Sequence, residues 1–465
     1  MRPRALSDVA PAIDGRLVGR DVVVSSAETD SRRVRPGSLF FALRGERADG
    51  HEHVAAAFAA GAAAAVVARE VEGGPLVIVA DPGVALLALA AAERGAFDGP
   101  VVGITGSTGK TSTKDLLAAV LAGRWRVAAS PASFNNRVGL PLSILGAPDG
   151  TEVLVCELGA SAVGEIRLMC GVAHPTVAVV TNVGLAHLGR FGSREKIVRA
   201  KAELVEALPD EGVAVLNADD PVVRGYAART PARSLLFGTA GDADVRAEDV
   251  SLSDDATASF TLVHGGRRTA VELTVPGEHM VSNALAAAAT GIALGLGPDT
   301  CAEALRDARV SAWRMETFET IDGVKVLNDA YNANPASMSA ALKAARWMSR
   351  GGRCIAVLGH MAELGGASME EHERVGEVVA RLGIERLVVV GQEARGIARG
   401  ATREGVEPED VVVVGTAAEA LAEVRAHARP GDLVVVKGSR VVGLEWLAEA
   451  LRRGVDAASE RGLAS

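Results

Sequence analysis

The chain has 465 residues, of which 48% are hydrophobic, 23% are charged and 3% are aromatic, and its formal net charge is −9. This composition excludes a disordered or low-complexity chain and allows about three globular domains of roughly 150 residues each. A mildly acidic protein has no broad basic surface, so we expect no nucleic-acid partner. Lys is rare compared with Arg, which gives weak extra weight to the remaining Lys positions as places that need a primary amine.

Neither the cysteines nor the first residues indicate export. The four cysteines form no CxxC pair and no zinc-type pattern with His, and Cys156 and Cys354 lie in apolar runs typical of buried strands. We therefore expect reduced thiols in the core. The N-terminal residues contain no continuous apolar segment like that of a signal peptide, and the most apolar stretch, residues 54–68, is too short to cross a bilayer. A cytoplasmic protein without membrane insertion is expected.

Three segments follow one another and predict an α/β protein of three domains. Residues 1–97 contain short strands, an Ala-rich helix and a strand at 76–80, which indicates a small mixed α/β domain. Residues 98–311 alternate strands and helices like a parallel sheet covered on both faces, and they include a hairpin. Residues 312–465 predict a second open α/β sheet. The predicted strands are residues 101–105, 153–156, 177–181, 213–217, 259–264, 268–275, 354–358, 387–390, 411–414 and 433–436.

The sharpest local signal is a glycine-rich turn between a predicted strand and an amphipathic helix. Glycines let backbone N–H groups converge on phosphate oxygens, and the helix N-terminus adds partial positive charge. Lys110 can bridge the β- and γ-phosphates, and the Thr111 hydroxyl can hold Mg²⁺. Ile104 stands where the strict motif has Gly, so the loop is a variant that predicts a nucleoside triphosphate but no particular reaction. The loop and its first helical residues are Gly106, Ser107, Thr108, Gly109, Lys110, Thr111 and Ser112.

Two more strands of the same sheet lead to potential metal ligands. Glu157 stands at the end of one strand and His187 lies just beyond another, and ligands of open α/β sheets bind outside the carboxyl ends of the strands. In the helix predicted over residues 193–208, Lys201 lies on the apolar stripe. Two interpretations of Lys201 remain open. Its ammonium group reaches water along a buried stem, or the desolvated amine loses its proton, takes up CO₂ and holds a second Mg²⁺ as a carbamate, together with Glu157 and His187.

These motifs make the chain resemble the Mur ligases, a family of ATP-dependent amide-forming enzymes of peptidoglycan precursor synthesis. The resemblance implies a UDP-sugar-binding domain over residues 1–97, a central P-loop-type ATPase domain over 98–311 and a Rossmann-like domain over 312–465 that docks the incoming amine. It also implies a carbamylated lysine, which matches Lys201, and catalytic roles for Lys110, His187 and Lys201. The matching stretches are residues 105–111, 182–187, 201, 283, 313–316 and 328–335.

The resemblance further implies roles for individual polar residues. Asn283 would meet the adenine, Arg314 the triphosphate and Asp329 the ribose. For residues 332–335 a plain turn is the competing interpretation. Residues implied to face the substrates are Ser31, Arg32, Asp49 and His51 in the UDP-sugar loops, Asn135 and Asn136 in the central domain, and Asn332 and Lys437 in the C-terminal domain.

Within the family, residues 134–141, 328–335 and 361–365 are similar to the branch that adds D-alanyl-D-alanine. This similarity implies two small-molecule substrates, UDP-MurNAc-tripeptide and D-Ala-D-Ala, with ATP and two Mg²⁺ ions, and we expect a monomer. One departure is His360, where the family usually has Asp. The alternatives are a folylpolyglutamate synthase or a tripeptide-forming Mur ligase, which share the architecture, and a P-loop nucleotide switch with no ligase activity.

Overall fold

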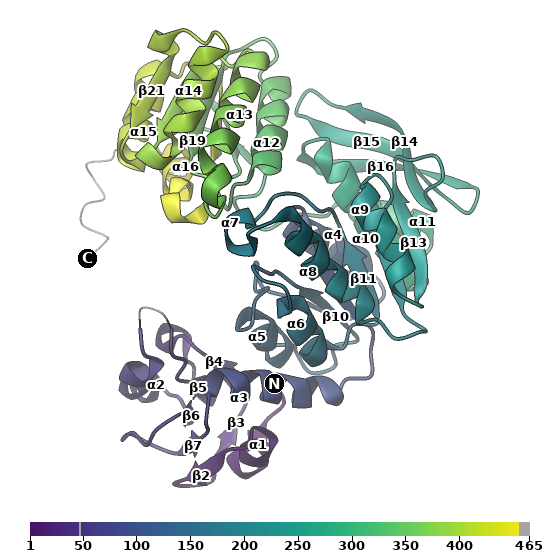
Figure 1. Ribbon diagram of the computed structural model, residues 1–465, viewed down its shortest axis with the longest axis vertical. Coiled ribbons are helices and arrows are strands. Elements are labelled where there is room, and N and C mark those ends of the chain that lie inside the picture. The colour runs from purple at the N-terminus through teal and green to yellow at the C-terminus, as the bar shows by residue number, and fades with distance from the viewer. Residues whose placement is uncertain (46–47, 455–465) are drawn as a thin grey trace.

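The structure is a computed structural model that describes residues 1–45 and 48–454, so the end of the predicted third segment, residues 455–465, lies outside the described residues. Three sheets with helices packed on them follow one another along the chain (Figure 1). The prediction of an α/β protein is confirmed. Among the described residues, no helix is both long and apolar enough to pass through a membrane.

The N-terminal sheet has five strands in the order β2-β7-β6-β5-β4, with β2 antiparallel to β7 and the other neighbours parallel. Its core is built on β5, where Leu39, Phe40 and Phe41 are at most 1% exposed. A separate pair, β1 and β3, is antiparallel. The elements are β1 (Arg4–Ala5), α1 (Leu6–Ala12), β2 (Arg16–Val18), β3 (Val23–Val24), β4 (Ser26–Glu28), β5 (Ser38–Phe41), α2 (Val54–Ala59), β6 (Ala64–Val67), β7 (Leu76–Ile78) and α3 (Pro82–Gly95).

The central sheet has nine strands in the order β16-β15-β14-β13-β12-β11-β8-β10-β9, parallel from β9 to β14 and antiparallel at β15 and β16. Strands β8, β10 and β11 are buried along their whole length, as expected for a sheet covered on both faces. Its strands are β8 (Val101–Thr105), β9 (Val127–Ala129), β10 (Val153–Glu157), β11 (Val177–Val180), β12 (Val213–Asn217), β13 (Arg233–Gly238), β14 (Val245–Leu252), β15 (Thr257–His264) and β16 (Arg267–Pro276). Its helices are α4 (Lys110–Ala122), α5 (Gly139–Leu145), α6 (Glu165–Ala173), α7 (Leu188–Phe191), α8 (Arg194–Glu206), α9 (Pro221–Arg224), α10 (His279–Ala293) and α11 (Pro298–Arg306).

The C-terminal sheet has six strands in the order β17-β18-β22-β19-β20-β21, and all neighbours except β17 and β18 are parallel. Figure 1 shows its helix α13 in green above the short helix α7 of the central part, and α7 contacts the turn at Gly365–Ala367. The elements are β17 (Glu316–Glu319), β18 (Lys325–Asn328), α12 (Pro335–Met348), β19 (Cys354–Gly359), α13 (Ser368–Arg381), β20 (Arg386–Val390), α14 (Arg395–Arg403), β21 (Val411–Val414), α15 (Ala417–His427), β22 (Leu433–Lys437) and α16 (Leu444–Arg453).

All eleven predicted strands are present, and the Gly265-Gly266 turn joins β15 to β16 with both glycines in the left-handed region. Strands β9, β13, β14, β17 and β18 were not predicted. Strand β9 has only three residues, and the other four are partly exposed and carry polar residues, so none has the continuous apolar run that marks a buried strand.

The order of the central strands determines where functional groups gather. Strand β8 lies between β10 and β11, and all three are parallel. Their carboxyl ends therefore lie at one edge, where β8 leads into the glycine-rich loop, β10 ends with Glu157 and β11 leads to residues 182–187.

Candidate active site

A cleft of about 800 Å³ opens at this edge and is lined by residues of both the central and the C-terminal parts. Fifteen of the residues singled out in the sequence line it, but Gly106 and Lys201 do not, nor do the four predicted residues of the N-terminal part. The fifteen are Ser107, Thr108, Gly109, Lys110, Thr111, Ser112, Asn135, Asn136, Glu157, His187, Asn283, Arg314, Asp329, Asn332 and Lys437.

The glycine-rich loop has the geometry that its sequence predicts. Gly106 and Gly109 both have positive φ, and a Cβ at Gly109 would collide with the Asn283 amide. Thr108 donates its backbone N–H to Asn182 Oδ1 at 2.9 Å, which ties the loop to the segment after β11. Lys110 begins α4 and donates to the Gly106 carbonyl at 2.8 Å, so its ammonium group lies over the loop.

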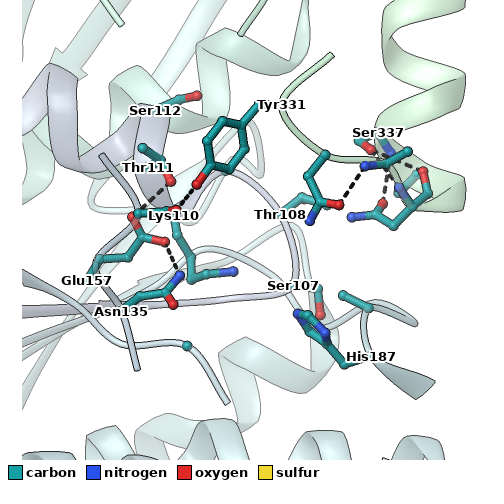
Figure 2. Close-up of a pocket in the computed structure, with 18 of the residues that line it drawn as sticks. Ser107, Thr108, Lys110, Thr111, Ser112, Asn135, Glu157, His187, Tyr331 and Ser337 are labelled. Carbon is teal, nitrogen blue, oxygen red and sulfur yellow. Dashed lines mark hydrogen bonds between the residues drawn. The ribbon is translucent and has the colours of Figure 1, made fainter. Parts of the chain in front are cut away.

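Thr111 and Glu157 form the buried centre of the cleft wall. Thr111 Oγ1 donates to Glu157 Oε2 at 2.8 Å, and Asn135 Nδ2 donates to Glu157 Oε1 at 2.8 Å (Figure 2). Arg314, from the start of the C-terminal part, donates to Thr111 Oγ1 at 2.9 Å. Because the Thr111 hydroxyl both donates and accepts, it brings α4, β10 and the start of the C-terminal part into contact.

The surroundings of Glu157 fit a divalent cation. Glu157 is 1% exposed, and no ion pair to it occurs among the described residues, although an unpaired buried carboxylate is costly. No group of three His, Cys, Asp or Glu side chains suited to a metal occurs within residues 1–45 and 48–454. Mg²⁺ commonly takes one or two carboxylates and completes its shell with water and substrate phosphates, so one buried carboxylate beside Thr111 is a sufficient protein contribution.

Lys110 and His187 share one electrostatic environment. Burial lowers the pKa of Lys110, Glu157 opposes this shift and Arg314 adds to it. Burial also lowers the pKa of His187, with a further lowering by Lys110 and an opposing effect from Glu363. Figure 2 shows Glu157 on one side of Lys110 and His187 on the other. The lowered pKa favours the neutral form of the imidazole, which is the form that binds a metal ion.

Lys201 is buried in α8 with an exposure of 3% for the whole residue, and both interpretations of its amine stay predictions. Its neighbours on the stripe, Ile197 and Leu204, are fully buried, as the periodicity predicts. Within the described residues its amine makes no hydrogen bond or ion pair. Burial, with a contribution from Lys110, lowers the pKa of Lys201 well below its ordinary value. A buried amine whose pKa is lowered in this way fits modification by CO₂.

The C-terminal part supplies the opposite wall. Lys437 ends β22 with 1% exposure, and its ammonium group contacts the Asp329 carboxylate and the Asn332 carbonyl, the latter at 2.9 Å. Asn332 Oδ1 accepts the Ala333 N–H at 2.9 Å, so a turn is indeed present, yet Asn332 still lines the cleft. On the central side, Asn283 is 5% exposed and reaches Thr113 Oγ1 at 3.4 Å.

The four predicted residues of the N-terminal part make local contacts. Arg32 pairs with Asp30 and is exposed, and Ser31 begins the same short turn. The Asp49 carboxylate accepts from the His51 ring at 2.6 Å, and His51 Nε2 accepts the Ala68 N–H at 2.9 Å. A second, smaller pocket lies between residues 28–33 of the N-terminal part and residues 133–142 of the central part. Asn136 lines both this pocket and the cleft.

Several lining residues received no role from the sequence. His279 lies one helical turn before Asn283, and Arg314 stacks on Tyr331 with 4.0 Å between guanidinium carbon and ring centre. Glu363 contacts His187 from the C-terminal part. Glu363 lies within residues 361–365, a stretch that the sequence already marks as a family motif. A single sequence does not indicate that this motif contacts His187.

Models of three Mur ligase domains match successive parts of the chain. The Mur ligase family catalytic domain matches residues 23–91, the Mur ligase middle domain 104–291 and the Mur ligase glutamate ligase domain 313–440. A curated relative from Mycobacterium leprae, named UDP-N-acetylmuramoyl-tripeptide--D-alanyl-D-alanine ligase, is 42% identical over 96% of both chains. The chain belongs to the Mur ligase family. A relative of the same name from Bacillus subtilis is 36% identical over 97% of this Mur ligase and 99% of its own length.

Solved structures agree with this membership. MurF from Acinetobacter baumannii is 31% identical and superimposes with a TM-score of 0.87 over 97% of this Mur ligase and 99% of that chain. MurF from Thermotoga maritima, solved in complex with ADP, is 30% identical with a TM-score of 0.80 over 92% and 97% of the two chains. The three-domain ligase architecture is thus shared along nearly the whole chain.

Proposed function

We propose that this Mur ligase joins the amine of D-Ala-D-Ala to the terminal carboxylate of UDP-MurNAc-tripeptide and converts ATP to ADP and phosphate. The observation that carries the proposal is the match, over 96% of both chains, to a relative named for this activity, together with a cleft that contains the glycine-rich loop. ATP use agrees with the solved relative that holds ADP. The reaction is a step of peptidoglycan precursor synthesis, and we place it in the cytoplasm, where ATP is available.

The chemistry explains why a phosphate loop and a second substrate site share one cleft. A carboxylate resists attack by an amine, because it is anionic and its leaving group would be oxide. Transfer of the γ-phosphoryl group to a carboxylate oxygen gives an acyl phosphate, and ADP departs. The amine then attacks the acyl carbon, loses a proton and expels phosphate, so that the amide forms. Positioning and stabilisation of charge account for most of the acceleration in such a sequence.

The residues of the loop and of β10 have distinct roles in this proposal. Lys110 neutralises charge on the β- and γ-phosphates once it is drawn from the Gly106 carbonyl. Thr111 and Glu157 would hold Mg²⁺ at the phosphates, and His187 and carbamylated Lys201 would join Glu157 in holding a second ion. Bound Mg²⁺ supplies a Lewis acid that neutralises phosphate charge and orients the carboxylate. Arg314 adds a positive charge beside Thr111.

The proposal of a carbamate on Lys201 is supported by three observations. The amine is buried, it has no partner in the described part of the chain, and burial lowers its pKa. Addition of CO₂ to the neutral amine, with loss of one proton, would turn an uncompensated nitrogen into an anionic oxygen ligand. Lys201 does not line the cleft in this structure, so the added group would have to extend from the amine toward His187, whose electrostatic environment it already shares.

The remaining predicted site residues divide between the nucleotide and the substrates. Asn283 would contact the adenine and Asp329 the ribose, with Lys437 holding Asp329 in place. Asn135, Asn136 and Asn332 would meet the peptide substrates across the cleft. Ser31, Arg32, Asp49 and His51 would shape the UDP-sugar loops. The domains would be residues 1–97, 98–311 and 312–465, acting as a monomer.

A substrate panel tests the proposed function. Purified protein is given ATP and Mg²⁺ with several UDP-MurNAc-peptides and with amino acids or dipeptides, and phosphate release is measured. Fast release is expected only with UDP-MurNAc-tripeptide and D-Ala-D-Ala together. Preference for a single amino acid and a shorter UDP-peptide would indicate the tripeptide-forming ligase, and release without either substrate would indicate a nucleotide switch. Lys110→Ala should remove turnover, and full turnover in that variant would refute the assignment of the loop.

A further inference from the structure

At one point near the cleft, the backbone of the C-terminal part contacts the backbone of the central part directly. Gly189, in α7, donates its N–H to the Glu363 carbonyl at 2.8 Å. A Cβ added to Gly189 would lie 2.6 Å from the Gly365 nitrogen and 3.0 Å from the Glu363 oxygen. Atoms do not approach a Cβ that closely, so this contact requires a residue without a side chain at 189.

The side chain of Glu363 contacts residues on either side of Gly189 in the sequence. Glu363 Oε1 accepts from Arg190 Nε at 2.7 Å, and Oε2 contacts Nδ1 of His187. Both carboxylate and imidazole are about one-third exposed, so the contact lies at the mouth of the cleft rather than in free solvent. The Glu363 carboxylate therefore adds two side-chain contacts to the backbone contact between the two parts.

His187 and Glu363 both have left-handed backbone, with φ of +60° and +63°. Non-glycine residues rarely adopt this conformation, and it persists where the surroundings enforce it, commonly at ligand clamps and active sites. Here both partners of one contact have this rarely adopted conformation. Such an arrangement indicates a specific contact rather than an incidental surface ion pair.

The contact also determines which ring nitrogen of His187 is available to the cleft. A carboxylate accepts hydrogen bonds, so it selects the ring form with its proton on Nδ1 and leaves the lone pair of Nε2 free. Histidine ligands of metal ions are commonly oriented in this way by a carboxylate on the opposite nitrogen. In this chain the orienting carboxylate belongs to a different part of the molecule from the histidine.

We propose that Glu363 is a positioning residue that couples docking of the C-terminal part to assembly of the metal-binding side of the cleft. The inference rests on the proposed function of His187 as a ligand of the second ion. While Glu363 is docked, His187 is held with Nε2 toward the cleft. When the C-terminal part moves away, the imidazole loses its orienting partner, and the second ion is bound more weakly.

Two variants separate the charge of Glu363 from the docking contact. Glu363→Gln removes the carboxylate but keeps the length of the side chain, whereas Gly189→Ala blocks the backbone contact and changes no polar group. Glu370→Gln, on the surface of α13, and Gly171→Ala, on an open face of α6, are matched controls. Each protein is studied with a β,γ-imido analogue of ATP and UDP-MurNAc-tripeptide. Mn²⁺ binding is followed by electron paramagnetic resonance and compaction by small-angle scattering, and thermal melting checks that the variants are folded.

We expect the dissociation constant of the weaker of the two Mn²⁺ sites to rise about 10- to 100-fold in Glu363→Gln and in Gly189→Ala. Both controls should keep the wild-type dissociation constant. Gly189→Ala should also lose compaction. Wild-type affinity in Glu363→Gln would overturn the positioning role. Wild-type affinity in Gly189→Ala despite lost compaction would overturn the coupling to docking. If Glu363→Gln melts at a lower temperature than the wild-type protein, Glu363→Asp replaces it, because Asp keeps the charge but is shorter. The Mn²⁺ affinity of Glu363→Asp then decides the question in the same way.

Failure of the proposed function gives a different result. Phosphate release by the wild-type protein is measured on the same samples with both substrates present. Release that depends on both substrates, combined with unchanged Mn²⁺ binding in the variants, refutes only the role of Glu363. A wild-type protein that releases no phosphate refutes the ligase proposal, and the inference about Glu363 with it.

Discussion

Replacement of Lys201 by Met is expected to stabilise the fold while removing activity. Met has nearly the length and volume of Lys, so it fills the space between Ile197 and Leu204 without leaving a cavity. It removes an amine that is 3% exposed and has no partner among the described residues. Leaving a buried polar group unsatisfied typically costs about 1–3 kcal/mol, and we expect the free energy of unfolding to rise by that amount.

The pH dependence of this stabilisation has a definite sign. In the unfolded chain Lys201 binds a proton up to its ordinary pKa of 10.5, whereas burial lowers its pKa in the fold. Between the two values the unfolded state carries the extra proton, so the stability of the wild-type protein rises with pH. The advantage of Lys201→Met should therefore be largest near neutral pH and shrink as the pH approaches 10.5.

Urea unfolding in CO₂-free, metal-free buffer measures the stability, and phosphate release with both substrates measures the activity. We expect ligation to fall by at least about 10²–10³, the typical loss for one group that stabilises charge in the transition state. Bicarbonate should not restore it, whereas in Lys201→Ala, which leaves space beside the cleft, short carboxylic acids should restore part of it. Near-normal ligation by Lys201→Met would refute the active-site role, and a loss of stability of 1 kcal/mol or more would refute the description of an unpartnered buried amine.

Three further predictions concern the loop, the buried carboxylate and the thiols. Gly109→Ala should raise the KM for ATP at least tenfold, because its Cβ would displace the Asn283 side chain from the cleft wall; an unchanged KM would contradict this. Glu157→Gln should lower kcat about 10²–10³-fold and weaken Mn²⁺ binding to the nucleotide complex, whereas equal Mn²⁺ affinity would exclude Glu157 as a ligand. Burial raises the pKa of all four thiols to about 12, so the folded protein should not react with a thiol reagent at pH 8, and its stability should fall above pH 9, where only the unfolded thiols lose protons. Reaction without unfolding would contradict this prediction, because it would show that a thiol is accessible in the folded protein. The four thiols are those of Cys156, Cys170, Cys301 and Cys354.

The sequence predicts the buried strands and the phosphate loop because their signals are local. A strand covered on both faces must be apolar throughout, and a loop around phosphates needs glycines at fixed spacing before Lys110. The same reasoning placed Glu157 at the strand end where the structure has it. Strand β14 was missed because several of its residues are exposed and polar, so it has no continuous apolar run.

Contacts between distant segments could not be predicted in this way. The pairing of His187 with Glu363 and the hydrogen bond from Arg314 to Thr111 join the central part to the C-terminal part. Such contacts depend on how two separately folded sheets meet, and no periodicity within either segment encodes that orientation. The roles of individual substrate residues and the bounds of the domains likewise stay predictions.

The hydrogen bond between Arg314 and Thr111 has a thermodynamic consequence. Nucleotide in the cleft would touch both the glycine-rich loop and residues beyond 312, so it would bind more tightly when the two parts are together than when they are apart. Reciprocity then requires that nucleotide favour the united arrangement by the same factor. Bound triphosphate would thus stabilise the contact between the two parts as well as drive the reaction. Release of ADP and phosphate would weaken that contact at the stage when the product must leave.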